Sequence, residues 1–288
     1  MPTTAKSPGK KARSVLAGHW APAFLTQSIW LCGLLLLLIA EILLRQLIGI
    51  PTAQTILAML HPALQSVLPY ALVLAGMLLM DLLLLSPLRL GRVKYFRRQM
   101  EGEDSIRELF SFYRGKRYGR AIWWRLRLWA RYLLWGCLFL LPGSLALGWS
   151  ALIRTGAVSD VTGMLVLCLN LIGVLSLLSG FIALCLWMLR YQPASLLLAE
   201  DEPSGNVFRR SARAMKGELG ELAWLYLRLS GWVVGEWLLL PGFYAGPLVA
   251  TARTQFLLRV LQRAEARESA AQAVHPRRRF FRKTPVSQ

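Results

Sequence analysis

The chain has 288 residues, of which 55% are hydrophobic, and it carries a formal net charge of +19. This composition excludes an ordinary soluble domain of the same length. Several apolar runs reach the roughly 20 residues that a helix needs to cross the hydrocarbon layer, and helices satisfy their own backbone inside lipid. The sequence therefore predicts an all-α fold, a polytopic transmembrane helical bundle. We interpret the positive charge as setting orientation, and we do not expect nucleic acid as a partner.

The first two apolar runs cover residues 24–45 and 65–86, and each is expected to cross the membrane. Ile50-Pro51 should end the first run and Ser86-Pro87 the second, because a residue that precedes proline is pushed out of helical geometry. No lysine or arginine lies between the two runs. Residues 1–23 precede the first run and form a basic tail. We expect this tail to lie in the cytoplasm.

A basic and then acidic segment follows Pro87, and Ser105 and Glu108 within it fit the capping-box pattern. The pattern predicts a short amphipathic helix with Ile106, Leu109, Phe110 and Tyr113 on one face. Two placements stay open for it. The helix can lie in the headgroup layer at the cytoplasmic interface, or it can pack on the bundle itself.

The third and fourth runs cover residues 128–150 and 161–189. Arg125, Arg127 and Arg131 flank or enter the third run beside several tryptophans, so we expect them to reach lipid phosphates as headgroup contacts. Pro142-Gly143 within this run predicts a kink or a break. The fourth run is longer than the bilayer needs, and it must tilt or project beyond the membrane.

The last two runs cover residues 218–240 and 244–261, with Pro241-Gly242 between them, and a basic tail of residues 263–288 follows. Both termini and the segments after the second and fourth runs hold most of the 34 basic residues, whereas the gaps after the first and third runs hold only Arg154. Two termini on one side require an even number of crossings, which favours six spans over five within a membrane domain of residues 24–262. The bias predicts a multi-pass membrane protein with both termini cytoplasmic.

Charged residues inside apolar runs are functional candidates, because they are costly in lipid. Arg228, Glu236 and Arg253, with Asn170, are predicted to form a polar cluster in the membrane. The cluster either braces the bundle, which we favour, or lines a small polar cavity.

Two acidic residues have simpler expected partners. Glu41 and Arg45 are spaced i, i+4 and are expected to form an ion pair on one helix face. Asp81 is expected to be the counter-ion of Arg89 or Arg92.

Small residues four apart, Gly231 with Gly235 and Ser176 with Gly180, allow helices to approach closely. Such pairs serve packing within one chain or formation of a homodimer, and both alternatives stay open.

The three histidines are dispersed, and the four cysteines lack paired spacing. No catalytic, phosphate-binding or metal-binding motif is present. We therefore predict no catalytic residues, no metal and no cofactor.

Short motifs give the chain a resemblance to a known family. The following pieces carry it: Pro87-Leu88 with Gly91, then Tyr95-Phe96, Glu103, Ser105-Ile106, Leu109-Phe110, Leu134-Trp135, Pro142-Gly143, Ser211, Met215-Lys216-Gly217, Gly231-Trp232, Pro247 and Phe256. In this order they resemble the bacterial membrane-protein family catalogued as domain of unknown function 975. The resemblance implies a multi-span membrane protein, and it implies no established activity.

Together these features predict a non-enzymatic inner-membrane protein that organises or assists other membrane proteins or lipids. Its expected partners are the lipid bilayer, anionic phospholipids, and either other membrane proteins or a second copy of the chain. The alternative is a small transporter or lipid-handling permease that uses the polar cluster of Arg228, Glu236 and Arg253. An intramembrane enzyme ranks third.

Overall fold

The computed structural model describes residues 8–48, 64–103, 105–154, 160–200, 206–237 and 239–274, and these residues contain helices and no strand. The all-α prediction is therefore confirmed for the described part of the chain. The elements are α1 (Pro8–Leu16), α2 (Trp20–Ile48), α4 (Leu64–Met80), η1 (Asp81–Leu85, a π-helix), α5 (Ser86–Met100), η2 (Ile106–Tyr113, a 3₁₀-helix), α6 (Gly115–Arg154), α7 (Asp160–Met188), η3 (Leu189–Tyr191, a 3₁₀-helix), α8 (Pro193–Ala199), α9 (Val207–Ala214), α10 (Leu219–Arg228), α11 (Ser230–Trp237) and α12 (Leu239–Val274).

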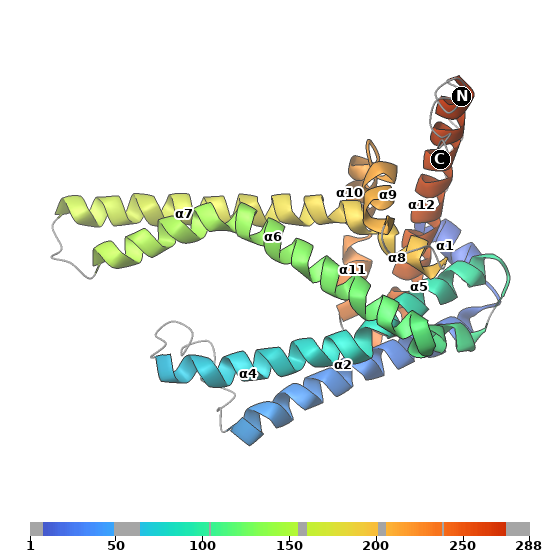
Figure 1. Cartoon of the computed structure of the whole chain (residues 1–288), viewed down its shortest axis with the longest axis horizontal. Coiled ribbons are helices and arrows are strands. Elements are labelled where there is room, and N and C mark those ends of the chain that lie inside the picture. The colour runs from blue at the N-terminus through green and yellow to red at the C-terminus, as the bar shows by residue number, and fades with distance from the viewer. Residues whose placement is uncertain are drawn as a thin grey trace, which may run out of the picture.

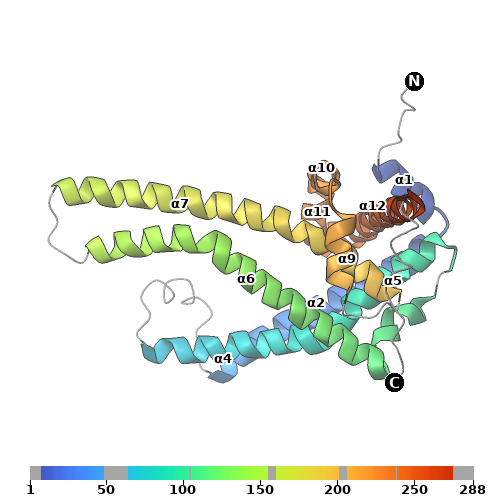
Figure 2. The same ribbon diagram turned by 45° about the horizontal axis from the view of Figure 1, so that its top comes forward.

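Two long helical hairpins extend in the same direction from one end of the molecule, α2 with α4 and α6 with α7 (Figures 1 and 2). The remaining elements, α1, α5, η2, η3 and α8 to α12, gather at the base of the hairpins (Figure 1). We call this region of the molecule the polar end. Four helical stretches among the described residues are long and apolar enough to cross a membrane: Trp20–Ile48, Pro69–Met100, Gly115–Ile153 and Thr162–Ala199. These correspond to the first four predicted spans. The predicted count of six is not confirmed.

The second hairpin helix does not end at Ser86-Pro87, so that prediction is wrong. The chain stays helical from α4 through η1 into α5, and Pro87 lies in the first turn of α5. In η1 the Ser86 N–H bonds to the Asp81 carbonyl, five residues back. This wider π-turn, together with the missing N–H of Pro87, leaves carbonyl groups of η1 to other donors. The helix therefore continues past a proline that would otherwise stop it.

Pro142 also lies inside a helix, because α6 is continuous from Gly115 to Arg154. Figure 1 shows α6 bent part-way along rather than straight. A proline removes one backbone hydrogen bond and bends a helix whose neighbours hold it in place. Of the two predicted alternatives, a kink or a break, the structure has a bent continuous helix and no break (Figure 1).

The buried core lies in the polar end and not between the two hairpins. Tyr95 and Phe96 of α5 and Leu196–Leu198 of α8 are almost fully buried, and α12 adds Leu257 and Val260 to the same cluster. In contrast, leucines along α2, α4, α6 and α7 are largely exposed. Exposed aliphatic faces of this length suit contact with lipid. The polar end thus has the core of a soluble protein, and the hairpins do not.

The segment after α5 packs on the protein, which is one of the two placements left open for it. Leu109 and Phe112 of η2 are buried. A Cβ added to Gly91 would lie 1.9 Å from the Leu109 carbonyl oxygen, so η2 rests directly on the α5 backbone. The predicted capping box is wrong, because Ser105 makes no side-chain cap. Glu108 pairs with Lys94 instead, at 2.7 Å.

The last helices run differently from the predicted fifth and sixth spans. Helices α10 and α11 are short and separate at Leu229. In Figures 1 and 2 the long α12 runs across the direction of the hairpins. Near its start, Tyr244 stacks on Trp20 and Phe243 stacks on Phe24, with ring centroids 5.0 and 5.5 Å apart. The turn into α12 therefore lies level with the first residues of α2, at the polar end.

Candidate functional site: an ionic junction at the base of the hairpins

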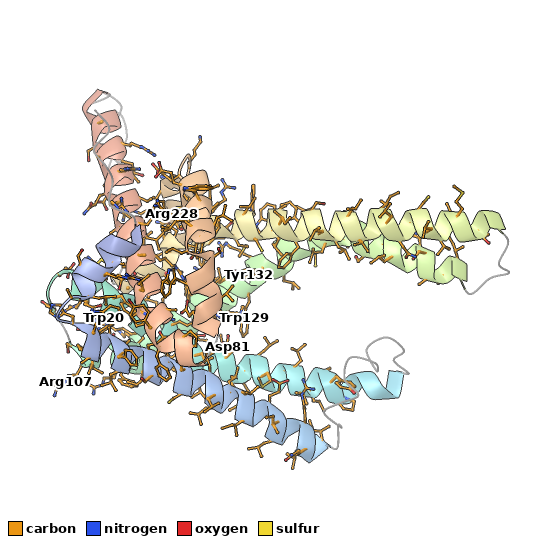
Figure 3. The ribbon with its side chains drawn as sticks, turned by 180° about the vertical axis from the view of Figure 1, so that it is seen from behind. Trp20, Asp81, Arg107, Trp129, Tyr132 and Arg228 are labelled. Carbon is orange, nitrogen blue, oxygen red and sulfur yellow. The ribbon has the colours of Figure 1, made fainter. Side chains whose placement is uncertain are left out.

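A group of charged side chains links the hairpins to each other and to α11, where they meet the polar end. Its members are Asp81, Arg89, Arg92, Arg125 and Glu236, and we call it the ionic junction. The residues come from η1, α5, α6 and α11. Figure 3 shows Asp81 at the root of the α2–α4 hairpin, near Trp129 of α6.

The junction is built on the π-helix η1. A π-turn is frequently found at functional sites. The Tyr118 hydroxyl donates to the Leu83 carbonyl at 3.2 Å, and the Tyr113 hydroxyl donates to the Leu84 carbonyl. Burial, followed by the neighbouring Tyr118, raises the pKa of Tyr113 further above neutral pH, where the hydroxyl of an ordinary tyrosine is already protonated. Tyrosines of η2 and α6 thus satisfy carbonyls that Pro87 and the π-turn leave open.

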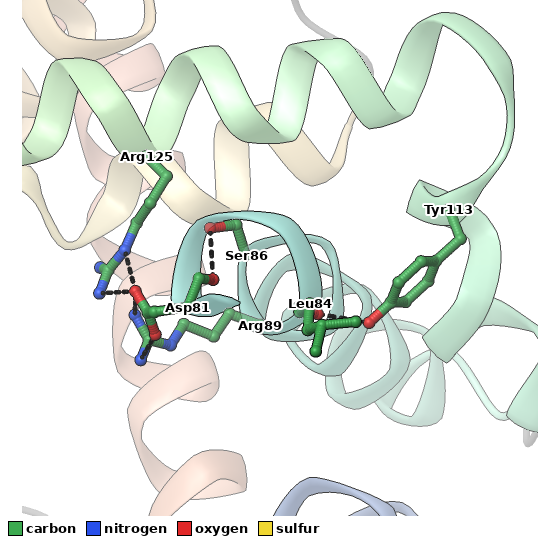
Figure 4. Close-up of polar contacts among 6 residues, drawn as sticks. All are labelled: Asp81, Leu84, Ser86, Arg89, Tyr113 and Arg125. Atoms are coloured by element: carbon green, nitrogen blue, oxygen red, sulfur yellow. Dashed lines mark hydrogen bonds and ion pairs between the residues drawn. The ribbon is translucent and has the colours of Figure 1, made fainter. Parts of the chain in front are cut away.

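Asp81 is the central carboxylate, and it accepts from two arginines. Arg89 lies 2.7 Å away and Arg125 lies 3.0 Å away (Figure 4). The Asp81 side chain is only 13% exposed. The predicted pairing of Asp81 with Arg89 is therefore confirmed, and Arg125 is a second partner. Because Arg125 belongs to α6, this carboxylate joins one hairpin to the other.

Arg92 extends the junction to the C-terminal helices. It pairs with Glu236 of α11 at 2.7 Å and donates to the Gly246 carbonyl of α12 at 3.4 Å. Its guanidinium lies over the rings of Trp30 and Phe96, 5.4 and 5.8 Å from their centroids. An arginine over an aromatic face gains cation–π attraction beyond its ion pair. Arg92 thus connects α5 with α2, α11 and α12.

The four residues of the predicted polar cluster lie in separate surroundings. Glu236 binds Arg92, and Asn170 accepts a 2.6 Å hydrogen bond from Ser150 within the α6–α7 hairpin. Arg228 is exposed at the end of α10, away from Asp81 (Figure 3). Among the described residues, no ion pair joins Glu236 to Arg228 or Arg253. The separation of α10 from α11 at Leu229 is the physical reason, because it interrupts the straight helix that the prediction assumed.

The other predicted pair lies along α2. Arg45 donates to Glu41, one turn earlier on the same helix. Both side chains are about three-quarters buried, with 22% and 28% of their surface exposed. The pair lets two charges lie on an otherwise apolar helix.

The three arginines predicted to contact lipid headgroups have protein neighbours. Arg125 pairs with Asp81. Arg131 lies 3.9 Å from the Phe208 ring centroid and donates to the Arg127 carbonyl. Arg127 lies over the Trp123 ring at 4.9 Å. Arg125 and Arg131 therefore face other helices of this chain, and headgroup contact by Arg127 stays a prediction.

Sequence reasoning missed a buried carboxylate at Glu218, which it placed at the start of a span. The Glu218 side chain is 5% exposed and pairs with Arg263 at 3.1 Å and Arg267 at 2.6 Å. The two arginines are four apart, on one face of α12. Their spacing was the available signal, because such a pair on a helix face favours an acidic partner from a neighbouring element.

No family model, curated protein or solved structure matches this chain. The resemblance to the family catalogued as domain of unknown function 975 therefore stays a prediction. Within the described ranges, no group of three His, Cys, Asp or Glu side chains could hold a metal ion.

Proposed function

We propose that this protein is a non-enzymatic component of the bacterial cytoplasmic (inner) membrane that organises or assists other membrane proteins or lipids. The proposal rests on the observation that the charged residues at the base of the hairpins are paired with one another. Asp81 binds Arg89 and Arg125, and Arg92 binds Glu236. Their pairing suits a structural brace, and it leaves the exposed apolar faces of the hairpins as the surfaces available to partners.

We further propose four membrane crossings with both termini in the cytoplasm, and α10, α11 and α12 at the cytoplasmic interface. Four crossings keep the even number that the charge distribution requires. Two observations support this arrangement. Tyr244 stacks on Trp20 at the start of α2. In addition, Trp224 and Leu227 of α10 are 64% and 63% exposed, as suits an interfacial helix.

Six crossings is the alternative, as the apolar runs 218–240 and 244–261 predict. In that arrangement Pro241-Gly242 would lie on the outer side, near the far end of α2. The stacking of Phe243 on Phe24 instead supports a position of Pro241-Gly242 near the start of α2, on the cytoplasmic side.

A transporter or lipid-handling permease is the second candidate function. It would use Arg228, Glu236, Arg253 and Asn170 as a mid-membrane polar cluster. The contact of Glu236 with Arg92 and that of Asn170 with Ser150 weigh against it, because these groups already have partners on different helices.

Photo-crosslinking in native membranes tests the accessory role. A photoreactive amino acid replaces Leu36, Leu43 or Leu74, which are 61%, 58% and 60% exposed on α2 and α4. The accessory role predicts a discrete protein adduct at one of these positions, whose partner mass spectrometry then identifies. Leu88, which is 4% exposed, is the matched control and should give no adduct to another chain.

Lipid adducts alone at all three positions would contradict a role in organising other proteins. Lipid-preserving extraction, followed by identification of the bound lipids, would then separate the two candidates. Enrichment of one lipid species would favour the permease.

A further inference from the structure

A hollow lined mostly by basic side chains lies where η2 turns into α6, and the ionic junction does not include it. It has a volume of about 1060 Å³. Figure 3 shows one of its residues, Arg107, at the outer edge of the polar end. We call it the basic hollow, and it is lined by Arg107, Glu108, Phe110, Ser111, Arg114, Gly115, Lys116, Arg117 and Arg120.

The turn at Gly115 brings the basic residues together. Gly115 has a φ of +54°, a left-handed conformation that glycine adopts without strain. The chain can therefore reverse direction sharply between Arg114 and Lys116. As a result, basic residues of η2 and of the first turns of α6 line the same hollow.

The charge of the hollow is strongly positive. Five of its nine lining residues are arginine or lysine, and Glu108 is the one acid among them. Glu108 already pairs with Lys94 on α5, at 2.7 Å. Arg107, Arg114 and Lys116 are exposed and have no ion pair within the described part of the chain. Unpaired cations around one hollow favour a ligand with phosphate oxygens.

The surface beside the hollow indicates that the phosphate belongs to a lipid. Lys116, Trp123 and Leu134 are spaced by seven and eleven residues, so they lie on one face of α6. Trp123 is 47% exposed and Leu134 is 65% exposed. At a rise of about 1.5 Å per residue, Trp123 lies about 10 Å and Leu134 about 27 Å from Lys116 along the axis. Along this face the order is basic at Lys116, aromatic at Trp123, whose ring Arg127 covers, and aliphatic at Leu134. This is the order of the headgroup, interface and acyl layers of a membrane.

We infer that the basic hollow binds the headgroup of an anionic phospholipid that carries two or more negative charges, with its acyl chains along the Trp123–Leu134 face of α6. A headgroup with one negative charge would leave most of the three unpaired cations without a partner. This inference rests on the proposed function, because it takes the membrane as the environment of this chain.

The test measures binding of the purified full-length chain to vesicles of phosphatidylcholine that contain phosphatidic acid or cardiolipin. Vesicles with phosphatidylglycerol, matched in total negative charge, provide the comparison. The variant R107Q/R114Q/K116Q removes the three exposed cations of the hollow. The matched control R209Q/R213Q/K216Q removes three exposed cations from α9 and the turn after it. Both triple variants lower the net charge by the same amount.

We expect the hollow variant to bind phosphatidic acid or cardiolipin at least about tenfold more weakly, as loss of one charge-assisted hydrogen bond can do. The control should lose no more than about twofold, the usual effect of exposed charges. Equal losses in both variants would overturn the inference, because the attraction would then be that of a general basic surface. Because all three side chains of the hollow are exposed, the fold should survive, and thermal unfolding of each variant verifies this. The single variant K116Q, measured in the same binding assay, also tests the contribution of the hollow.

A second arm distinguishes lipid from soluble phosphate. If inorganic phosphate or glycerol phosphate displaces the lipid completely and W123A/L134A leaves binding unchanged, the ligand is soluble and the lipid assignment is overturned. The crosslinking at Leu36, Leu43 and Leu74 reports on a different surface. Failure of the accessory role and failure of the basic hollow are therefore distinguishable.

Discussion

The two hairpins differ in how their helices meet. In the α6–α7 hairpin, a Cβ added to Gly180 would lie 2.2 Å from the Phe139 carbonyl oxygen, and one added to Gly143 would lie 2.8 Å from the Leu177 nitrogen. In the α2–α4 hairpin, a Cβ at Gly76 would meet only the end of the Leu44 side chain, at 3.2 Å. One hairpin is packed backbone against backbone, and the other through flexible side chains.

This difference indicates where each hairpin obtains its stability. Lipid is as apolar as leucine, so helices in a membrane associate through close packing and polar contacts rather than the hydrophobic effect. The α6–α7 hairpin has close packing along its length. The α2–α4 hairpin depends more on its base, where Trp30, Leu85 and Leu88 are buried beside the ionic junction. We therefore expect substitutions along α7 and substitutions at the base of α4 to act on different hairpins.

The largest effect is expected from Gly180→Val. The added side chain must push α7 from the α6 backbone, which should cost about 3 kcal/mol of unfolding free energy. Thermal unfolding in detergent, followed by the helical circular dichroism signal, measures it. Gly163→Val on the same helix is the control, because nothing lies within 4 Å of its Cβ position. Equal losses in the two variants would show that the backbone contact does not stabilise the hairpin.

Asp81→Asn should have the next largest effect. It leaves Arg89 and Arg125 without their shared carboxylate at a mostly buried position, at a cost of about 2 kcal/mol. We expect hydrogen exchange to become faster in α4 and α5 and to change little in the middle of α7. Uniformly faster exchange in both hairpins would contradict the separation of their supports.

Arg92 and Glu236 should be coupled by about 1 kcal/mol, the usual size for a polar contact in a membrane protein. A double-mutant cycle with Arg92→Gln and Glu236→Gln measures this coupling through thermal unfolding. Additive effects of the two substitutions would mean that the 2.7 Å contact does not stabilise the fold.

Gly76→Ala should have the smallest effect, a change of less than about 1 kcal/mol. Alanine favours the helix by a similar amount, and the end of the Leu44 side chain can move away from the new methyl group. A loss as large as that of Gly180→Val, measured by the same thermal unfolding, would show that the α2–α4 backbones are also closely packed.

The features that sequence could predict are local ones. The apolar runs marked four long helices. The i, i+4 spacing placed Glu41 with Arg45, and proximity in the chain placed Asp81 with Arg89. These depend on residues a few turns apart on one helix, so periodicity reveals them.

The features that it missed depend on contacts between distant elements. Arg92 and Glu236 are 144 positions apart, and no local pattern joins them. The π-turn at η1 is stabilised by tyrosines that follow it by about thirty residues. The start of α12 stacks on Trp20 and Phe24, and α12 is not among the described helices that are apolar enough to cross a membrane, although its apolar residues 244–261 predicted a span. Hydropathy measures the apolar character of a segment, and tertiary contacts decide its direction.

Cysteine accessibility at the turn into α12 tests the four-crossing arrangement most directly. In a background without Cys32, Cys137, Cys168 and Cys185, single cysteines replace Pro241, Ala17 at the polar end and Leu47 at the far end of α2. A membrane-impermeant maleimide is applied to intact cells and to inverted vesicles. Our account predicts that Pro241→Cys reacts from the same side as Ala17→Cys. Reaction from the same side as Leu47→Cys would contradict four crossings and establish the six-span arrangement.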